Sequence, residues 1–180
     1  MPLRRTTVIP AVVVPAVVSA LLAGCAGQTA PPSAGAEAYN EVDVMFTQMM
    51  IPHHGDAIAM ADFLLDHEGV RPEVAALAED IATGQRAENE QMNDWLATVD
   101  EGTVDLAEPS VGTESLEEAT PAQIEGAFLT EMIAHHEHGV EMSRSAAARG
   151  DSAVIGDLAQ KMTQDQTEEI TTMKSLLAAG

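Results

Sequence analysis

One short pattern occurs twice in this 180-residue chain, and it limits the folds that the chain can adopt. The letters MIPHH at residues 50–54, with Met60 beyond them, return as MIAHH at residues 132–136, with Met142 beyond them. Four of the six histidines therefore belong to two copies of one unit. A pattern repeated at a fixed offset predicts that one structural unit has been duplicated.

The likeness between the two copies continues beyond the histidines. Gln85 and Glu88 in the first copy correspond to Gln166 and Glu169 in the second. The offset falls from 82 to 81 residues on the way, so the turn inside the second copy is one residue shorter. Each copy is therefore interpreted as a helical hairpin.

The composition favours helix over sheet. Aromatic residues make up only 3% of the chain, whereas Ala, Leu, Met, Glu and Gln are abundant. We predict an all-α fold, a four-helix bundle made of two duplicated helical hairpins. The helices are expected at about 40–67, 72–97, 120–149 and 152–179. Asn40 should cap the first, and the capping box at 120–123 (TPAQ) should start the third. Residues 98–119 are read as an acidic connecting loop.

The first 39 residues differ from the rest. Arg4 and Arg5 precede an apolar run that ends in Leu-Ala-Gly before Cys25, the single cysteine. This arrangement resembles a bacterial lipobox. We expect a lipoprotein signal peptide at 1–24, lipidated Cys25 with a flexible tether at 25–39, and the helical domain at 40–180. The protein would then be exported and lipid-anchored to the outer face of the bacterial cytoplasmic membrane or to the cell surface. A soluble secreted protein with an incidental cysteine is the alternative.

The charge balance excludes one class of partner. The chain has 29 acidic and 8 basic residues, and such a surface repels nucleic-acid backbones. Contact with a membrane is therefore expected through the lipid anchor only. The acidity either provides solubility or attracts cations, and both readings stay open.

Helical periodicity places both histidine pairs on inward faces, together with methionines. Imidazole and thioether are ligands that soft and borderline transition metals prefer. Methionines at this spacing are more often core filler, but duplicated pairs of inward histidines are difficult to explain by packing alone. The candidate ligands are His53, His54, His135, His136, Met50, Met60, Met132 and Met142. His138 is an auxiliary candidate, and His67 is read as a surface or capping residue.

The partner helices carry acidic and amide residues on apolar stripes, where an unpaired glutamate is costly. Few lysines or arginines are expected on the inner faces. Gln85, Glu88, Gln166 and Glu169 are therefore expected to orient the imidazoles around a metal.

These motifs resemble the bacterial domain of unknown function 305 family over residues 40–179. The resemblance implies a ferritin-like four-helix bundle exported from the cytoplasm, with some copper-binding members connected with copper resistance. It gives the eight paired histidines and methionines the role of ligands. The chain departs from the family pattern at 55–56 (GD) and 137–138 (EH), where Gln-Gly is common. We also expect no acidic counterpart of Asp43 at the start of the third helix.

Ligand softness and compartment point to copper, as Cu(I) or Cu(II), with silver as a chemical mimic of Cu(I). We predict an extracytoplasmic protein that sequesters or buffers copper and is not an enzyme. A ferritin-like metallo-oxidase and a metal-free surface-tethered helical interaction module are the alternatives. A homodimer and a copper-transfer partner protein both remain open.

Overall fold

The computed structural model describes residues 37–105 and 113–180, and these residues contain helices and no strand. The predicted all-α fold class is confirmed. The elements are α1 (Glu41–Leu65), α2 (Pro72–Thr98), the short α3 (Glu114–Glu117), α4 (Ile124–Arg149) and α5 (Ala153–Ala179). The predicted signal peptide at 1–24, Cys25 and most of the predicted tether lie outside the described residues.

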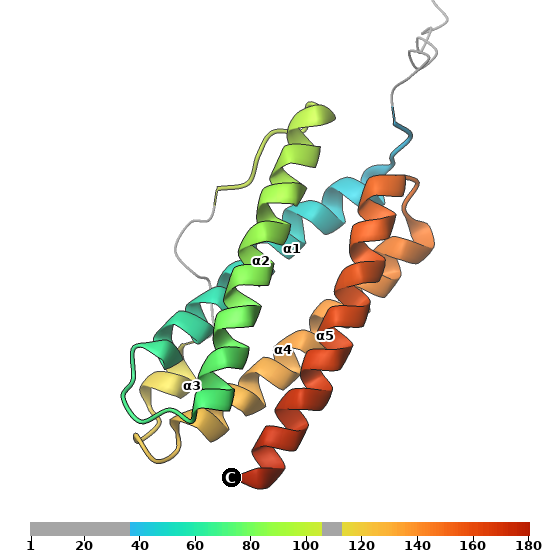
Figure 1. The fold of residues 1–180 in the computed structure, drawn as a ribbon. Helices are drawn as coiled ribbons and strands as arrows, with labels where there is room; N and C mark the ends of the chain where they lie inside the picture. Colours follow the sequence, from blue (N-terminus) through green and yellow to red (C-terminus); the bar gives the residue numbers. More distant parts are fainter. Residues whose placement is uncertain (1–36, 106–112) are drawn as a thin grey trace, which may run out of the picture. The chain divides into compact units, whose positions relative to one another are not determined.

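The long helices form two antiparallel hairpins, as the duplication predicts. α1 packs on α2, α4 packs on α5, and the main contact between the hairpins is made by α1 and α4. In Figure 1, α2 and α5 lie in front of the α1 and α4 pair. The two repeated motifs lie midway along α1 and α4, so the fold brings both copies to the contact between the hairpins.

The starts of two helices, α1 and α4, are predicted from capping residues. Asn40 accepts hydrogen bonds from the backbone N–H groups of Val42 and Asp43, so the predicted Asn40 cap of α1 is confirmed. The predicted start of α4 is wrong, because residues 120–123 form a turn and the helix begins at Ile124. The Thr120 hydroxyl donates to the Gln123 side chain at 2.7 Å, so these two side chains bond to each other and do not cap α4.

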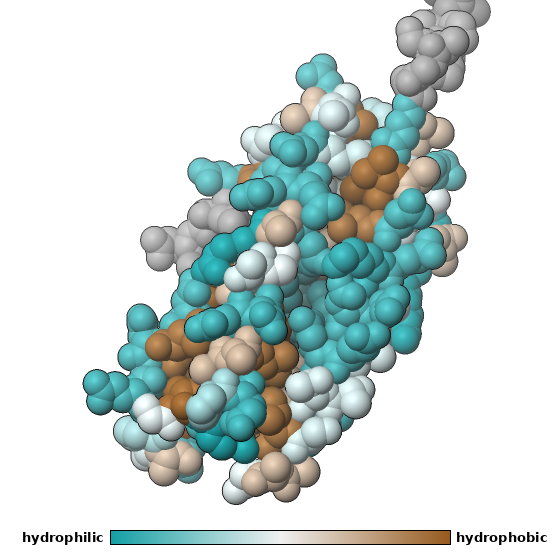
Figure 2. All heavy atoms as spheres, viewed as in Figure 1, coloured by the Kyte–Doolittle hydropathy of each residue, from teal (hydrophilic) through white to brown (hydrophobic). Residues whose placement is uncertain are grey.

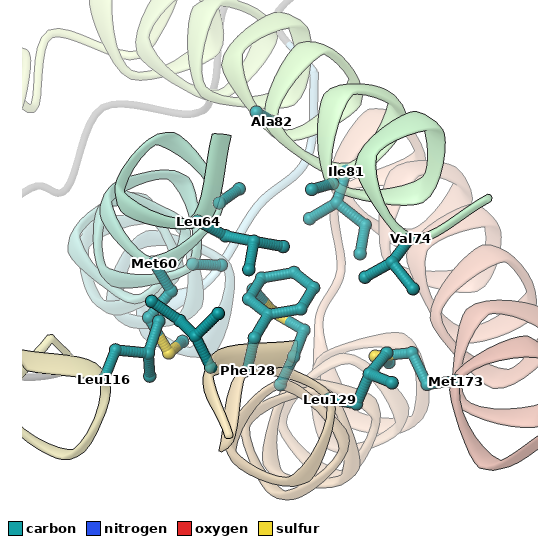
Figure 3. Close-up of a cluster of buried hydrophobic side chains, with 14 residues drawn as sticks. Met60, Leu64, Val74, Ile81, Ala82, Leu116, Phe128, Leu129 and Met173 are labelled. Atoms are coloured by element: carbon teal, nitrogen blue, oxygen red, sulfur yellow. The ribbon is translucent and has the colours of Figure 1, made fainter. Parts of the chain in front are cut away.

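The segment predicted as a connecting loop contains α3, which contributes to the core. Leu116 is only 1% exposed and packs in an apolar cluster with Met60 and Leu64 of α1 and Phe128 of α4. Figure 3 shows this cluster, with Leu116 close to Met60. One buried leucine therefore anchors an otherwise acidic segment to the bundle.

A second apolar cluster includes Phe46, Met50, Trp95 and Met162. Burial of apolar surface in these two clusters is the main favourable term for folding. The paired histidines belong to neither cluster.

Carboxylates at the starts of α1 and α4 tie each hairpin to the turn of the other. Oδ2 of Asp43 accepts hydrogen bonds from the backbone N–H groups of Asn40, Asp151 and Ser152 at 2.9–3.1 Å. Glu125 accepts from the backbone N–H and the Nε of Arg71 at 2.7 and 2.6 Å. The expectation that Asp43 has no acidic counterpart is wrong, because Glu125 stands 82 residues later and makes the equivalent link.

Glu37, which precedes the predicted domain start at residue 40, is bonded to the bundle. Glu37 accepts hydrogen bonds from the Ser152 hydroxyl, the Val154 backbone N–H and the Trp95 indole. Burial acts to raise the pKa of Glu37, but these hydrogen bonds outweigh it and the pKa lies below its ordinary value. The chain is therefore already held against α2 and α5 at Glu37.

The face carrying α2 and α5 is largely hydrophilic, as Figure 2 shows. In the described part of the chain, no helix is long and apolar enough to cross a membrane.

Asp43 supplies the first test. We expect Asp43→Ala to lower the free energy of unfolding by about 3 kcal/mol, because three backbone donors lose their shared acceptor in a buried position. Asp43→Asn keeps an acceptor oxygen and should lose less. Urea unfolding gives both values.

Asp62→Ala is the matched control, because Asp62 is an exposed acid on the same helix with an ion pair to Arg86. Such a pair contributes about 0–1 kcal/mol. Equal losses for Asp43→Ala and Asp62→Ala would contradict the cross-link.

Candidate metal centre

The centre of the site is a pair of histidines from different hairpins. His53 of α1 and His135 of α4 stack with ring centroids 3.7 Å apart and an angle of 30° between the ring planes. The two residues occupy equivalent positions in the repeat. The pseudo-two-fold relation between the hairpins therefore places the two copies of the motif in direct contact.

The second histidine of each pair is held by a glutamate from its own hairpin. Nε2 of His54 lies 2.9 Å from Oε2 of Glu88, and Nε2 of His136 lies 3.0 Å from Oε2 of Glu169. A carboxylate can only accept, so in the neutral ring Nε2 carries the proton and Nδ1 carries the lone pair. Both histidines are fully buried. Each glutamate therefore orients an imidazole and fixes Nδ1 as the ring nitrogen that carries the free lone pair.

The two histidine–glutamate pairs differ in their surroundings. Nζ of Lys161 lies 3.7 Å from Oε1 of Glu88, so a cation does reach one inner glutamate. The Lys161 pKa is raised, mainly by its hydrogen bond to Asp165 and then by the nearby carboxylates. The Glu88 side chain is 10% exposed and that of Glu169 is 26% exposed. The half of the site around Glu169 is therefore the more open to solvent.

Six ring nitrogens in this cluster are buried and lack a hydrogen-bond partner among the described residues. They are both nitrogens of His53, both of His135, and Nδ1 of His54 and His136. Both amide atoms of Gln85 and the amide oxygen of Gln166 are also buried without a partner. Buried polar atoms usually have partners, so a group of orphaned donors and acceptors at one place is typical of a binding site. The two glutamines do not hydrogen-bond to the imidazoles in this arrangement.

The central imidazoles are held neutral. Burial lowers the pKa of His53, and together with the smaller effects of the neighbouring His135 and His54 it brings this pKa to about 2. Burial likewise lowers the pKa of His135 to about 3, with His136 and His54 acting in the same direction and a weaker contact with the His53 backbone opposing them. A neutral imidazole is the form that binds metals.

The candidate sulfur ligands divide into two groups. Met50 and Met132 are fully buried and lie one helical turn before the histidines of their own helices. Met60 and Met142 follow the first histidine of each pair by seven residues, which is about 10 Å along a helix axis. All four methionines pack in or against the apolar clusters, Met60 and Met132 in the cluster of Figure 3 and Met50 and Met142 in or against the other, so only their spacing from the histidines separates them. Met50 and Met132 are therefore the methionines closer to the imidazoles.

The two remaining histidines have different positions. His138 is exposed, and its ring centroid lies 5.1 Å from that of His53, so it connects the cluster to the surface. His67 bonds through Nδ1 to the carbonyl of Phe63 at 2.8 Å, one turn before it on the chain. His67 takes no part in the cluster.

The cluster is not a preformed coordination sphere. Among the described residues, no three His, Cys, Asp or Glu side chains already converge in a metal-binding arrangement. In the stacked pair the two imidazoles lie face to face. The nitrogen lone pairs lie in the plane of each ring and point outward from its edge, not toward the other ring. The His53 and His135 rings would therefore have to turn before both could bind one metal ion.

Sequence reasoning gave no role to three residues next to these histidines. Asn89 is buried and donates to the carbonyl of Ile51 at 3.2 Å. Lys161 reaches Glu88 from α5. Gly139 leaves room beside His53 that the Gln166 amide occupies. Asn89 and Gly139 have a signal in the sequence, because helical periodicity places both on inward faces, whereas Lys161 has none.

Solved structures of similar proteins fall into two groups. The chain shares 28% identity with CopM in the Cu(I)-bound form, over 76% of this chain and 96% of that one, with a TM-score of 0.69. CopM has also been solved bound to silver and to Cu(II). A candidate secreted DUF305 protein of Streptomyces coelicolor is 29% identical over 77% of this chain and 91% of its own, with a TM-score of 0.69.

A DUF305 fragment from Deinococcus radiodurans is 26% identical over 78% of this chain and 98% of its own, with a TM-score of 0.62. No curated protein sequence matches the chain significantly. The family profile named domain of unknown function 305 matches residues 43–177, which include both histidine pairs and both hairpins. The chain therefore belongs to the DUF305 family.

Proposed function

We propose that this protein binds copper outside the cytoplasm and sequesters or buffers it, with the ion held by the histidine cluster at the contact of α1 and α4. The observation that carries the proposal is the group of six buried ring nitrogens without a hydrogen-bond partner among the described residues. Four imidazoles from two hairpins supply them.

The relatives support the choice of metal. CopM, a similar protein over most of this chain, is known in Cu(I)-bound, Cu(II)-bound and silver-bound forms. Imidazole accepts both oxidation states of copper, and thioether favours Cu(I). Silver(I) is soft as well and would mimic Cu(I) at the same ligands.

The positions of the side chains support one choice of ligands. His53, His54, His135 and His136 form the nitrogen set, and Met50 and Met132 are the sulfur donors one turn away. His138 would bind from the surface side of His53. Met60 and Met142 would serve only an ion displaced along the bundle by about two helical turns. Glu88 and Glu169 would act by orienting His54 and His136.

The site suits storage better than catalysis. Its donor atoms are buried, and the two central rings must turn before they bind, so an ion would be enclosed by protein as it is bound. We propose no reacting substrate and no catalytic base. Lipidation at Cys25 and attachment to the outer face of the membrane remain part of the proposal, and the candidate secreted relative is consistent with export.

The main test is metal binding by a variant that lacks all four paired histidines. We expect His53→Gln/His54→Gln/His135→Gln/His136→Gln to lose Cu(I) affinity by more than about 100-fold, because direct ligands matter more than the groups that orient them. Competition titration with a Cu(I) chelator measures the affinity, and elemental analysis measures the copper retained.

His67→Gln is the matched control. It replaces a histidine by glutamine just beyond the end of α1, where His67 bonds to a backbone carbonyl and has no contact with the histidine cluster. It should bind copper as the wild type does. If the quadruple variant remains helical and retains wild-type affinity, the proposed site is wrong. The double variant His53→Gln/His135→Gln gives the same decision should the quadruple variant unfold.

Because the central histidines are neutral in the folded state, the stability of the metal-free protein should fall as the pH falls. The folded pKa values of about 2 and about 3 lie below the unfolded value of 6.5, so the unfolded state binds more protons below pH 6.5. Their contribution to stability is fully present above pH 6.5 and is lost progressively as the pH falls toward the folded pKa values of about 3 and about 2. Between pH 7.5 and 5.5 the pair should remove about 2–3 kcal/mol of stability.

Urea unfolding at both pH values measures this loss in the wild type and in His53→Gln/His135→Gln. The double variant should lose less stability on acidification, because its central side chains no longer titrate. The same loss in both proteins would show that the two imidazoles are not held neutral by the fold.

A further inference from the structure

The two kinds of histidine in the cluster have different partners. His54 and His136 each have a glutamate that fixes one ring nitrogen. His53 and His135 have no hydrogen-bond partner for either ring nitrogen among the described residues. A histidine that binds a metal usually donates its other ring N–H to an acceptor, which fixes the tautomer and the ring orientation. The central pair therefore needs acceptors that it does not contact while stacked.

One acceptor lies next to His53. A Cβ atom built on Gly139 would meet the Gln166 amide oxygen at 2.4 Å and Cε1 of His53 at 3.2 Å. Cε1 is the ring carbon between the two nitrogens, so the nitrogen-bearing edge of His53 and the Gln166 amide lie against the same point. The Gln166 oxygen is buried and has no partner among the described residues. The absence of a side chain at residue 139 creates this approach.

We propose that Gly139 admits the Gln166 amide to the copper centre, where its oxygen accepts the N–H of His53 once that ring turns out of the stack. Gln166 then does for His53 what Glu88 does for His54, and the other nitrogen of His53 faces the metal. Gly139 and Gln166 are positioning residues. This inference rests on the proposed copper site and assigns how one of its ligands is held.

Only the second copy of the repeat has a glycine at this position. The position equivalent to Gly139 in the first copy is Ala57, and the residue equivalent to Gln166 is Gln85. Ala57 has the Cβ atom that Gly139 lacks, and it is completely buried. Gln85 therefore has less space beside Ala57 than Gln166 has beside Gly139. His53 and His135 are equivalent in sequence but inequivalent in their acceptors.

Two single variants test the proposal through metal affinity and folding stability. Gln166→Ala should weaken Cu(I) binding about tenfold or more and leave the urea midpoint of the metal-free protein unchanged or higher, since a buried amide oxygen without a hydrogen-bond partner among the described residues is removed. Gly139→Ala should fold, because the atom in its way is the end of a flexible side chain, and should weaken Cu(I) binding similarly by displacing the amide.

The double variant Gly139→Ala/Gln166→Ala separates positioning from packing. If Gly139 acts through Gln166, the double variant binds copper no more weakly than Gln166→Ala alone, and its urea midpoint recovers relative to Gly139→Ala. Additive losses of affinity would overturn the coupling. The double variant also gives a decision if Gly139→Ala alone does not fold.

Gly126→Ala is the matched control for a glycine on α4, because its Cβ would meet nothing within 4 Å. It should bind copper as the wild type does. Gln85→Ala is the comparator across the pseudo-two-fold axis and should lose less affinity than Gln166→Ala, whereas an equal loss would overturn the one-sided assignment. Wild-type affinity in Gln166→Ala sinks this inference alone, whereas a wild-type protein that binds no copper sinks the proposed function.

Discussion

Burial of four imidazoles at a single helix contact is the constraint on which the rest of the structure depends. Polar rings in a protein interior are costly unless their nitrogens find partners, and here only two of the eight do so within the described residues. The central pair avoids a greater cost by remaining neutral, as the low pKa values of His53 and His135 indicate. The fold must therefore compensate with apolar burial elsewhere.

The arrangement of the bundle meets that requirement. Two apolar clusters include residues of α1, α2, α4 and α5, and the paired histidines belong to neither of them. The carboxylates of Asp43 and Glu125 tie the start of each inner helix to the turn of the opposite hairpin. These links hold α1 and α4 in register, so His53 meets His135 across the contact. The proposed metal binding would thus compete with folding stability at the centre of one small domain.

Duplication produces the site but does not leave it symmetric. Lys161 approaches Glu88, whereas Glu169 is more exposed, and Gly139 replaces the alanine found in the first copy. His138 also has no counterpart in the first repeat. All of these differences change the surroundings of the histidines, and the paired residues themselves are retained. If the cluster binds copper as proposed, the ion would enter from the more exposed Glu169 side, and the ligands would be held on the more buried Glu88 side.

Much of the fold follows from local sequence signals. Helical periodicity, Asn40 as a cap and proline at residue 72 predict the hairpins, and the doubled motif predicts that they meet at the histidines. The wrong start of α4 has a local cause, since Thr120 and Gln123 bond to each other in a turn that precedes the helix. Leu116 could not be placed, because the scattered apolar residues of the acidic stretch 98–119 show no helical periodicity.

The site was less predictable than the fold. Spacing along a helix places histidines and glutamates on facing stripes, so the His54–Glu88 pairing is within reach of sequence reasoning. Ring stacking between His53 and His135 depends on rotamers and on the distance between α1 and α4, which periodicity does not contain. The role of Gly139 depends on a side chain from another helix reaching the same point.

X-ray absorption at the copper edge tests the central claim most directly, because it identifies the atoms bound to the ion without changing the protein. Copper held between the two hairpins should give the multiple-scattering pattern of at least two imidazoles, with a sulfur contribution from Met50 or Met132 in the Cu(I) form. A spectrum with oxygen neighbours only, as expected for copper on the acidic surface, would contradict a buried histidine centre.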